Sequence, residues 1–139
     1  MTVRFIAVSG PDRAGKDTLI QEVHKQTKFA HCVMNRNPVC YSVFVEYYNR
    51  DKKLINEAMD IDSALSKAPG ATLIYVTANT EDLVQRCKDT NHEILDFDYQ
   101  KTLYDKYFEM SKYPNKLTIN TSEENMEEVI KKWIKEGRL

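Results

Sequence analysis

The 139 residues include 42% apolar and 29% charged side chains, an ordinary globular balance, and we expect one domain over residues 1–139. The 20 Lys and Arg nearly cancel the 21 Asp and Glu, which argues against a general nucleic-acid-binding protein with its basic excess. No apolar run has the roughly 18 residues of a membrane-spanning helix. The three cysteines, Cys32, Cys40 and Cys87, follow no metal or redox spacing. We expect them to be reduced core thiols in a cytoplasmic protein.

The first half of the chain alternates apolar runs with amphipathic segments. The sequence predicts a buried strand over Val3 to Ser9, a helix over Lys16 to Gln26 and a second strand over Phe29 to Met34. Residue types between Pro38 and Tyr48 favour a strand, but proline suits a helix start and the apolar positions recur at helical spacing, so we expect a helix. A further amphipathic helix is expected over Lys52 to Lys67.

The second half continues this alternation. A third buried strand is expected over Ala71 to Val76, and Asn79 or Thr80 would cap the helix that follows it. A long helix is expected over Glu93 to Lys112, and a fourth strand over Lys116 to Asn120.

The end of the chain carries a helix-start signal. Thr121 and Glu124 form a capping-box pattern before an apolar stripe that includes Trp133, and Gly137 is placed where a helix would stop. Strands that alternate with helices predict an α/β domain, a three-layer α/β/α fold with a parallel sheet of about four strands. The second strand, which leads into Asn35, and the third strand are expected to lie on either side of the first strand.

The residues between the first strand and the first helix have the spacing of a phosphate-binding loop. Gly10 to Thr18 reads Gly-Pro-Asp-Arg-Ala-Gly-Lys-Asp-Thr, which contains the pattern G-x-x-x-x-G-K. Gly10 and Gly15 allow the backbone to curl with its N–H groups inward, and the helix that begins near Lys16 adds its positive dipole end. The pattern therefore predicts binding of the phosphates of a nucleoside triphosphate, with Lys16 at the outer phosphates.

Asp17 stands where the common pattern has Ser or Thr. A carboxylate holds Mg²⁺ directly or through water, but near phosphates it costs energy unless a metal lies between. We therefore expect either metal dependence or weakened triphosphate binding, with Thr18 offering its hydroxyl to an inner phosphate.

Several segments resemble one family. The run Pro-Asp-Arg-Ala-Gly-Lys-Asp-Thr resembles the phosphate loop of thymidylate kinases, and its Gly-Lys-Asp-Thr ending, with the small size, resembles phage-type deoxynucleoside monophosphate kinases. Asn35-Arg36-Asn37-Pro38 resembles the family's Asp-Arg motif, and Leu73 to Val76 and Leu117 to Asn120 resemble its later strands.

The resemblance implies a P-loop kinase that uses ATP and Mg²⁺ to phosphorylate a deoxynucleoside monophosphate, most of all dTMP. The expected partner is this small nucleotide, with no nucleic acid and no membrane, and a homodimer is left open. It implies that Arg13 stabilises the transferred phosphoryl group and that Asp12 contacts the sugar 3′-hydroxyl of the acceptor. The implied ATP-binding residues are Gly10, Ala14, Gly15, Lys16, Asp17, Thr18 and Arg86, with Asp17 at the metal, and the implied acceptor-binding residues are Asp12, Arg36, Tyr41 and Phe44.

The sequence departs from the family in places that keep alternatives open. Asn35 replaces an acidic residue, for which Asp17 compensates in our hypothesis; unchanged Mg²⁺ dependence in Asp17→Ala would count against it. No acceptor-binding segment fits between His24 and Met34. The expected lid, Arg86 to Glu93, is short, and its only basic side chains are Arg86, Lys88 and His92. A nucleoside kinase and a non-catalytic nucleotide-binding regulator are therefore alternative interpretations.

Structural interpretations stand beside the functional ones for several residues. Arg36 and Arg86 are alternatively solvated or paired with surface carboxylates, and Tyr41 and Phe44 are alternatively core residues. The three histidines are not expected to be ligands, because no Cys/His cluster has zinc spacing.

Overall fold

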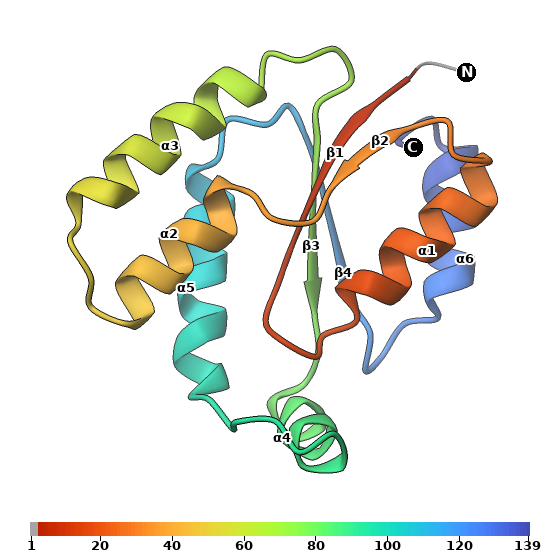
Figure 1. Ribbon diagram of the computed structural model, residues 1–139. Coiled ribbons are helices and arrows are strands. Elements are labelled where there is room, and N and C mark those ends of the chain that lie inside the picture. Colours follow the sequence, from red (N-terminus) through yellow and green to blue (C-terminus); the bar gives the residue numbers. More distant parts are fainter. Residues whose placement is uncertain (1–2) are drawn as a thin grey trace.

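The computed structural model describes residues 3–139, and helices follow strands along the whole of that range (Figure 1). The elements in chain order are β1 (Phe5–Ser9), α1 (Lys16–Thr27), β2 (Cys32–Met34), α2 (Pro38–Tyr47), α3 (Lys53–Leu65), β3 (Thr72–Thr77), α4 (Thr80–Asp89), α5 (Phe97–Met110), β4 (Asn115–Asn120) and α6 (Met126–Lys135).

The sheet is parallel throughout and has the strand order β2-β1-β3-β4. Ile6 pairs with Val33 on one side and with Thr72 on the other, so β1 is a central strand. The order confirms the expected four strands and the expected neighbours of β1. Because the connections between parallel strands are crossovers, the chain places a helix on one face of the sheet or the other after each strand.

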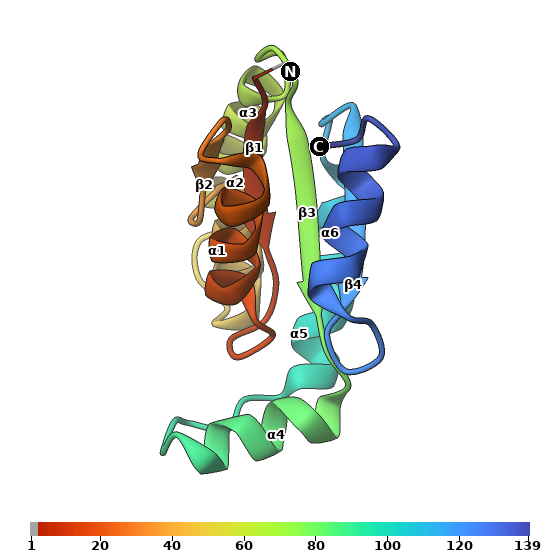
Figure 2. The same ribbon diagram turned by 90° about the vertical axis from the view of Figure 1, so that its right-hand side faces the viewer.

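Helices cover both faces of the sheet and make three layers. In Figures 1 and 2, α1 and α6 lie on one face, and α2, α3 and α5 lie on the other. Successive side chains of a strand point to opposite faces. Ile6 and Val8 accordingly pack in a core cluster with Leu19 of α1, and Ala7 packs in the second cluster with Tyr104 of α5.

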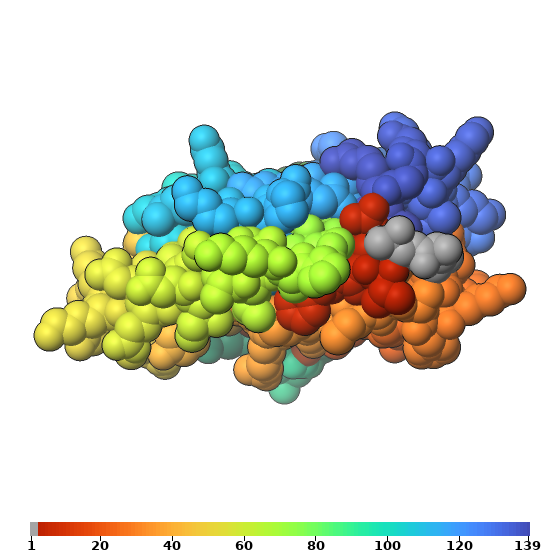
Figure 3. Space-filling view, turned by 90° about the horizontal axis from the view of Figure 1, so that it is seen from above, coloured from red at the N-terminus to blue at the C-terminus, as the bar shows by residue number. Residues whose placement is uncertain are grey.

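The two ends of the sheet differ in what lies against them. At the amino ends of the strands, Arg4 Nη2 donates to the Gly137 carbonyl at 2.6 Å, and the start of β1 meets the end of the chain (Figure 3). At the carboxyl ends, the β1–α1 loop and α4 lie together (Figures 1 and 2). The carboxyl edge of an open α/β sheet is where ligands bind, so this end positions the site.

Most predicted element boundaries agree with the structure to within about two residues, and three are wrong by more than that. The second strand begins at Cys32 rather than Phe29, because Phe29 has a φ of 60° and is 76% exposed in the turn after α1. The long helix begins at Phe97 rather than Glu93, because the Asp96 side chain accepts from Tyr99 N at 3.1 Å and caps it there.

The capping box at Thr121 and Glu124 is the third error. Glu124 Oε1 accepts from Asn120 N at 2.9 Å and closes a turn, while Asn125 caps α6 by accepting from Glu128 N at 3.0 Å. The Thr121 side chain instead bonds to the loop between β1 and α1.

The cysteine prediction needs one correction. Cys40 and Cys87 are buried as expected, but Cys32 is exposed because it stands at the beginning of the short edge strand β2. Across residues 3–139, no helix combines the length and the apolarity that crossing a bilayer requires.

Candidate active site

The β1–α1 loop is held in its curled form by backbone geometry. Gly10 passes so close to β3 that a Cβ atom there would lie 1.9 Å from the Val76 carbonyl oxygen. Gly15 has a φ of 107° and forms the N-cap of α1, where no side chain accepts from the first helical N–H groups. These N–H groups and the positive end of the helix dipole therefore face the loop, the arrangement that binds anions at helix N-termini.

Residues from the far end of the chain brace this loop. Thr121 Oγ1 donates to the Ala14 carbonyl at 2.7 Å, and Arg86 Nη1 donates to the Arg13 carbonyl at 2.9 Å and to Thr121 Oγ1 at 3.2 Å. Arg13 itself has a φ of 67°, in the left-handed region, where its carbonyl turns toward Arg86. The loop is thus fixed from α4 and from the turn after β4.

Asn37 ties the start of α2 to the end of β1. Its Oδ1 accepts from the Ser9 hydroxyl at 2.8 Å and from Val39 N at 3.1 Å, and its Nδ2 donates to the Val8 carbonyl at 2.9 Å. Since Asn37 is buried and bonded at both ends of its amide, it fixes the position of the neighbouring Arg36 relative to the phosphate loop.

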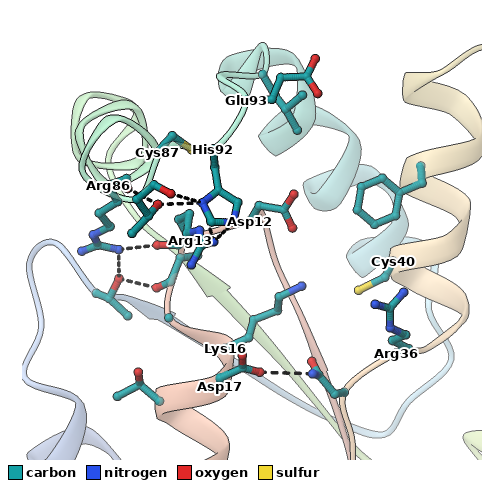
Figure 4. A pocket seen from close by; sticks show the side chains of 18 of the residues that line it. Asp12, Arg13, Lys16, Asp17, Arg36, Cys40, Arg86, Cys87, His92 and Glu93 are labelled. Carbon is teal, nitrogen blue, oxygen red and sulfur yellow. Dashed lines mark hydrogen bonds between the residues drawn. The ribbon is translucent and has the colours of Figure 1, made fainter.

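A cleft of about 970 Å³ lies at the carboxyl edge of the sheet (Figure 4). Its walls come from the phosphate loop, the end of β2, α2, α4, the α4–α5 loop and the turn after β4. Polar, charged and aromatic side chains that line it include Asp12, Arg13, Lys16, Asp17, Thr18, Asn35, Arg36, Phe44, Tyr48, Arg86, Cys87, His92 and Glu93.

The cations of the cleft differ in what they contact. Within residues 3–139, Lys16 and Arg36 make no ion pair or side-chain hydrogen bond, and Lys16 points into the space beside Arg36 (Figure 4). Arg13 instead points at the imidazole of His92 in the α4–α5 loop. The charges of Lys16 and Arg36 are therefore available to an anionic ligand. The carboxylates of Asp12 and Asp17, which line the same cleft, neutralise that positive charge only in part.

Burial controls two further ionisable groups on the walls. Burial raises the pKa of the Cys87 thiol, while the nearby Arg13 acts in the opposite direction. Burial also raises the pKa of the Tyr48 phenol, and the carboxylates of Glu93 and Asp12 add to that increase. Both shifts favour the neutral form of the group.

The residues beside Lys16 fit a magnesium ion held mainly by a substrate. Asp17 Oδ1 accepts from Asn35 Nδ2 at 3.2 Å, so a carboxylate and an amide lie together at the start of α1. Among residues 3–139, no three His, Cys, Asp or Glu side chains gather as a metal site. Mg²⁺ needs no such cage, because it is commonly held by one or two carboxylates together with phosphate oxygens and water.

The structure brings most of the expected site residues to the cleft but not all of them. Gly10 does not line it, since its place is against β3. Tyr41 is a correction: it is 47% exposed and lines a separate hollow of about 430 Å³ with Leu54 and Ile61, because its side of α2 faces α3 rather than the phosphate loop. Phe44 is on the cleft side of the same helix.

Sequence reasoning missed Thr121 and Asn37 as parts of the site, and it placed His92 in the lid without its contact with Arg13. Asn37 had a readable signal, because an Asn directly before a proline and an apolar run is a helix cap. The contacts of the other two had none. His92 meets Arg13 across 79 positions and Thr121 meets Ala14 across 107, and only the folded chain brings them together.

Arg86→Ala is expected to weaken ATP binding roughly tenfold, since it removes the donor that holds the Arg13 carbonyl, a loss of about 1.4 kcal/mol. Titration calorimetry would measure it, with the exposed Lys88→Ala on the same helix as control. Thr121→Val removes the hydroxyl bonded to Ala14 without removing a charge, and should reproduce part of the loss. Wild-type affinity in Arg86→Ala would contradict the bracing role of Arg86, and wild-type affinity in Thr121→Val would remove Thr121 from that role.

Comparison with known proteins finds likeness in structure alone. No family model matches the chain, and no curated protein matches it by sequence. The YorR protein of Bacillus subtilis, solved in complex with phosphorylated GDP, is similar with a TM-score of 0.71 and 15% identity, over 97% of this chain and 96% of that one. The deoxyadenosine kinase of M. mycoides with bound dCTP is similar with a TM-score of 0.63 and 15% identity, over 95% of this chain and 99% of that one. These likenesses confirm the expected three-layer P-loop kinase fold.

Proposed function

We propose that the protein transfers the terminal phosphoryl group of ATP to a deoxynucleoside monophosphate. The observation that carries this proposal is that one cleft joins the phosphate loop to a second cation, Arg36, which is unpaired among residues 3–139, and to an aromatic wall of Phe44 and Tyr48. A cleft with a phosphate loop at one end and an aromatic wall at the other suits two nucleotides that meet at their phosphates.

The donor would lie on the side of the phosphate loop. The free N–H groups at Gly15 and the start of α1 suit the inner phosphates, and the unpaired Lys16 suits the outer ones. Mg²⁺ would be held by Asp17 together with phosphate oxygens, and it would neutralise charge on the phosphates, while the Thr18 hydroxyl would donate to an inner phosphate. This use of Asp17 accounts for a carboxylate where a hydroxyl is usual.

The acceptor would lie on the side of α2. Its base would rest against Phe44, its phosphate would meet Arg36, and Asp12 would accept a hydrogen bond from its 3′-hydroxyl. In the transfer, an acceptor phosphate oxygen bonds to the γ-phosphorus of ATP as the bond to the β–γ bridging oxygen breaks, and ADP leaves. Arg13 and Lys16 would stabilise the charge that spreads over the transferred group.

Asn35 favours a phosphate over a hydroxyl as the acceptor group. A nucleoside hydroxyl must lose a proton when it attacks, whereas a monophosphate oxygen is already ionised. The residue at the end of β2 is an amide bonded to Asp17, and it is no base. Within this class, dTMP is the acceptor that we propose, because the phosphate loop resembles that of thymidylate kinases.

One observation favours a nucleoside kinase as the second candidate. One of the similar structures is a deoxyadenosine kinase, and it was also solved with the products dCMP and dCDP. In that case Asp12, the carboxylate of the loop, would accept the proton of the attacking hydroxyl.

The test is ADP formation from ATP and Mg²⁺ with each of the four deoxynucleoside monophosphates and the four deoxynucleosides. Turnover with dTMP above all others supports the proposal, and turnover only with a nucleoside supports the second candidate. If ATP binds but no acceptor yields ADP, both kinase proposals fail and the chain is a nucleotide-binding regulator.

A further inference from the structure

Two facing walls of the cleft come from segments that are far apart in the chain. Phe44 lines it from α2, and Glu93 lines it from the α4–α5 loop, residues 90–96 (Figure 4). Among residues 3–139, a single hydrogen bond joins that loop to α2: the Asp96 backbone N–H donates to the Tyr47 hydroxyl at 2.9 Å. Because the same loop also touches the phosphate loop, this bond connects the acceptor side of the cleft to the ATP side.

Asp96 stands where the α4–α5 loop ends and α5 begins. Its side chain accepts from Tyr99 N at 3.1 Å and its carbonyl accepts from Gln100 N at 2.9 Å, so it forms the N-cap of the helix. Its own N–H takes no part in the helix, and the Tyr47 hydroxyl is its partner. The bond to Tyr47 therefore acts at the boundary between a loop and a regular helix.

The α4–α5 loop is otherwise held at few points. Near its start, His92 N donates to the Cys87 carbonyl at 2.8 Å, but residues 93–95 make no hydrogen bond within the described range 3–139. Ile94 in the middle of the loop is 48% exposed. Segments with few buried contacts and solvent-accessible hydrogen bonds open locally at low cost in free energy. The bond between Asp96 and Tyr47 can thus form and break while the rest of the fold stays in place.

Aromatic contacts connect Tyr47 to the acceptor wall. Its ring stacks on Tyr99 in the first turn of α5, with centroids 5.7 Å apart, and meets the ring of Tyr48 edge-on at 4.9 Å. Tyr48 in turn is stacked on Phe44, with centroids 6.3 Å apart. A base that rests on Phe44 and Tyr48 therefore packs against the aromatic group whose next member bonds to Asp96.

The end of α2 that carries Tyr47 is fixed independently of this bond. Glu46 accepts from Lys106 Nζ at 2.8 Å and from the Tyr107 hydroxyl, and both donors belong to α5. When the bond between Tyr47 and Asp96 opens, α2 keeps its place on α5. The α4–α5 loop is then the part that moves.

We infer that Tyr47 is a positioning residue that makes ATP and the acceptor bind cooperatively, because its hydroxyl holds the α4–α5 loop when a base occupies the acceptor wall. A bound base restrains Tyr48 and with it Tyr47, which favours the loop arrangement that is bonded at Asp96. That arrangement keeps the loop against the phosphate loop, where ATP binds. Coupling between two ligands is reciprocal, so ATP raises the affinity for the acceptor by the same factor. The inference rests on the proposed function, since it needs both ligands in one cleft.

The experiment compares Tyr47→Phe, which removes only the hydroxyl, with Tyr99→Phe as a matched control. The Tyr99 hydroxyl makes no hydrogen bond within residues 3–139, although its ring stacks on Tyr47. Calorimetry gives the Kd for dTMP, or for the deoxynucleoside monophosphate that yields most ADP, with and without saturating Mg²⁺–AMPPNP, an ATP analogue whose γ-phosphoryl group is not transferred. Amide hydrogen exchange measures the protection of the Asp96 N–H directly.

The wild type and Tyr99→Phe are expected to bind the monophosphate roughly tenfold more tightly when the analogue is bound, and Tyr47→Phe less than about twofold more tightly. Without the analogue, the three proteins should have the same Kd within about twofold. At saturating ATP, Tyr47→Phe should raise the KM for the monophosphate roughly fivefold and change kcat by less than about twofold. Binding of the monophosphate should slow exchange of the Asp96 amide in the wild type and leave it unchanged in Tyr47→Phe.

An equal effect of the analogue on the wild type and Tyr47→Phe, or no effect on the wild type, would overturn the inference and leave the kinase proposal in place. A Kd raised equally with and without the analogue would also overturn it, because Tyr47 would then support the fold or touch the acceptor. If no deoxynucleoside monophosphate binds, both the inference and the proposed function fail. Cooperative binding that depends on Tyr47, together with no transfer, would support the inference and remove the kinase proposal.

Discussion

Gly10→Ala is expected to destabilise the protein by at least about 3 kcal/mol and to abolish ATP binding. The new Cβ would lie 1.9 Å from the Val76 carbonyl oxygen, and backbone cannot rotate away as a flexible side chain can. β1 and β3 are adjacent central strands, so relief of the clash must either part them or displace the loop that begins at Gly10. Urea denaturation would give the free energy of unfolding, and calorimetry the affinity for ATP.

Gly137→Ala is the matched control for this change. Gly137 has a φ of 73°, but a Cβ there would meet nothing within 4 Å. This variant carries only the cost of a left-handed backbone, about 1 kcal/mol, and leaves ATP binding unchanged. If the two variants were equally stable, close packing of Gly10 on β3 would not be what requires glycine at this position.

Lys16→Ala is expected to weaken ATP binding roughly 100-fold and to bring phosphoryl transfer below detection, with the free energy of unfolding changed by less than about 0.5 kcal/mol. The side chain makes no ion pair within residues 3–139, and other cations line the same cleft. Its removal therefore costs the fold little and costs the bound phosphates a charged partner.

Lys25→Ala serves as the control, because Lys25 is exposed in the last turn of the same helix. It should leave both the affinity and the transfer rate unchanged. Wild-type affinity in Lys16→Ala would remove the phosphate loop from the proposal, whatever the acceptor panel gives. A large loss of stability in Lys16→Ala would instead show that the charge supports the fold.

The layers of the fold were predictable because their cause is local. Buried parallel strands need continuous apolar runs, such as the one that ends at Ser9, and amphipathic helices need apolar residues at helical spacing. Even the ambiguous segment after Asn37 was correctly predicted to be a helix, because proline at its start outweighed its strand-forming residues. Boundaries were less predictable, since a turn such as that at Phe29 depends on where the next strand pairs.

The prediction of phosphate binding followed from residues adjacent in the chain. The spacing of Gly10, Gly15 and Lys16 places backbone N–H groups and a charge together whatever the rest of the chain does. The composition of the cleft around them did not follow. His92 at Arg13, Thr121 at Ala14 and the turning of Tyr41 away from the cleft arise where α4, the turn after β4 and α3 pack against distant parts of the chain. Contacts between residues far apart in sequence leave no local pattern, so the sequence specifies the phosphate loop and only the packing of the sheet and helices specifies its partners.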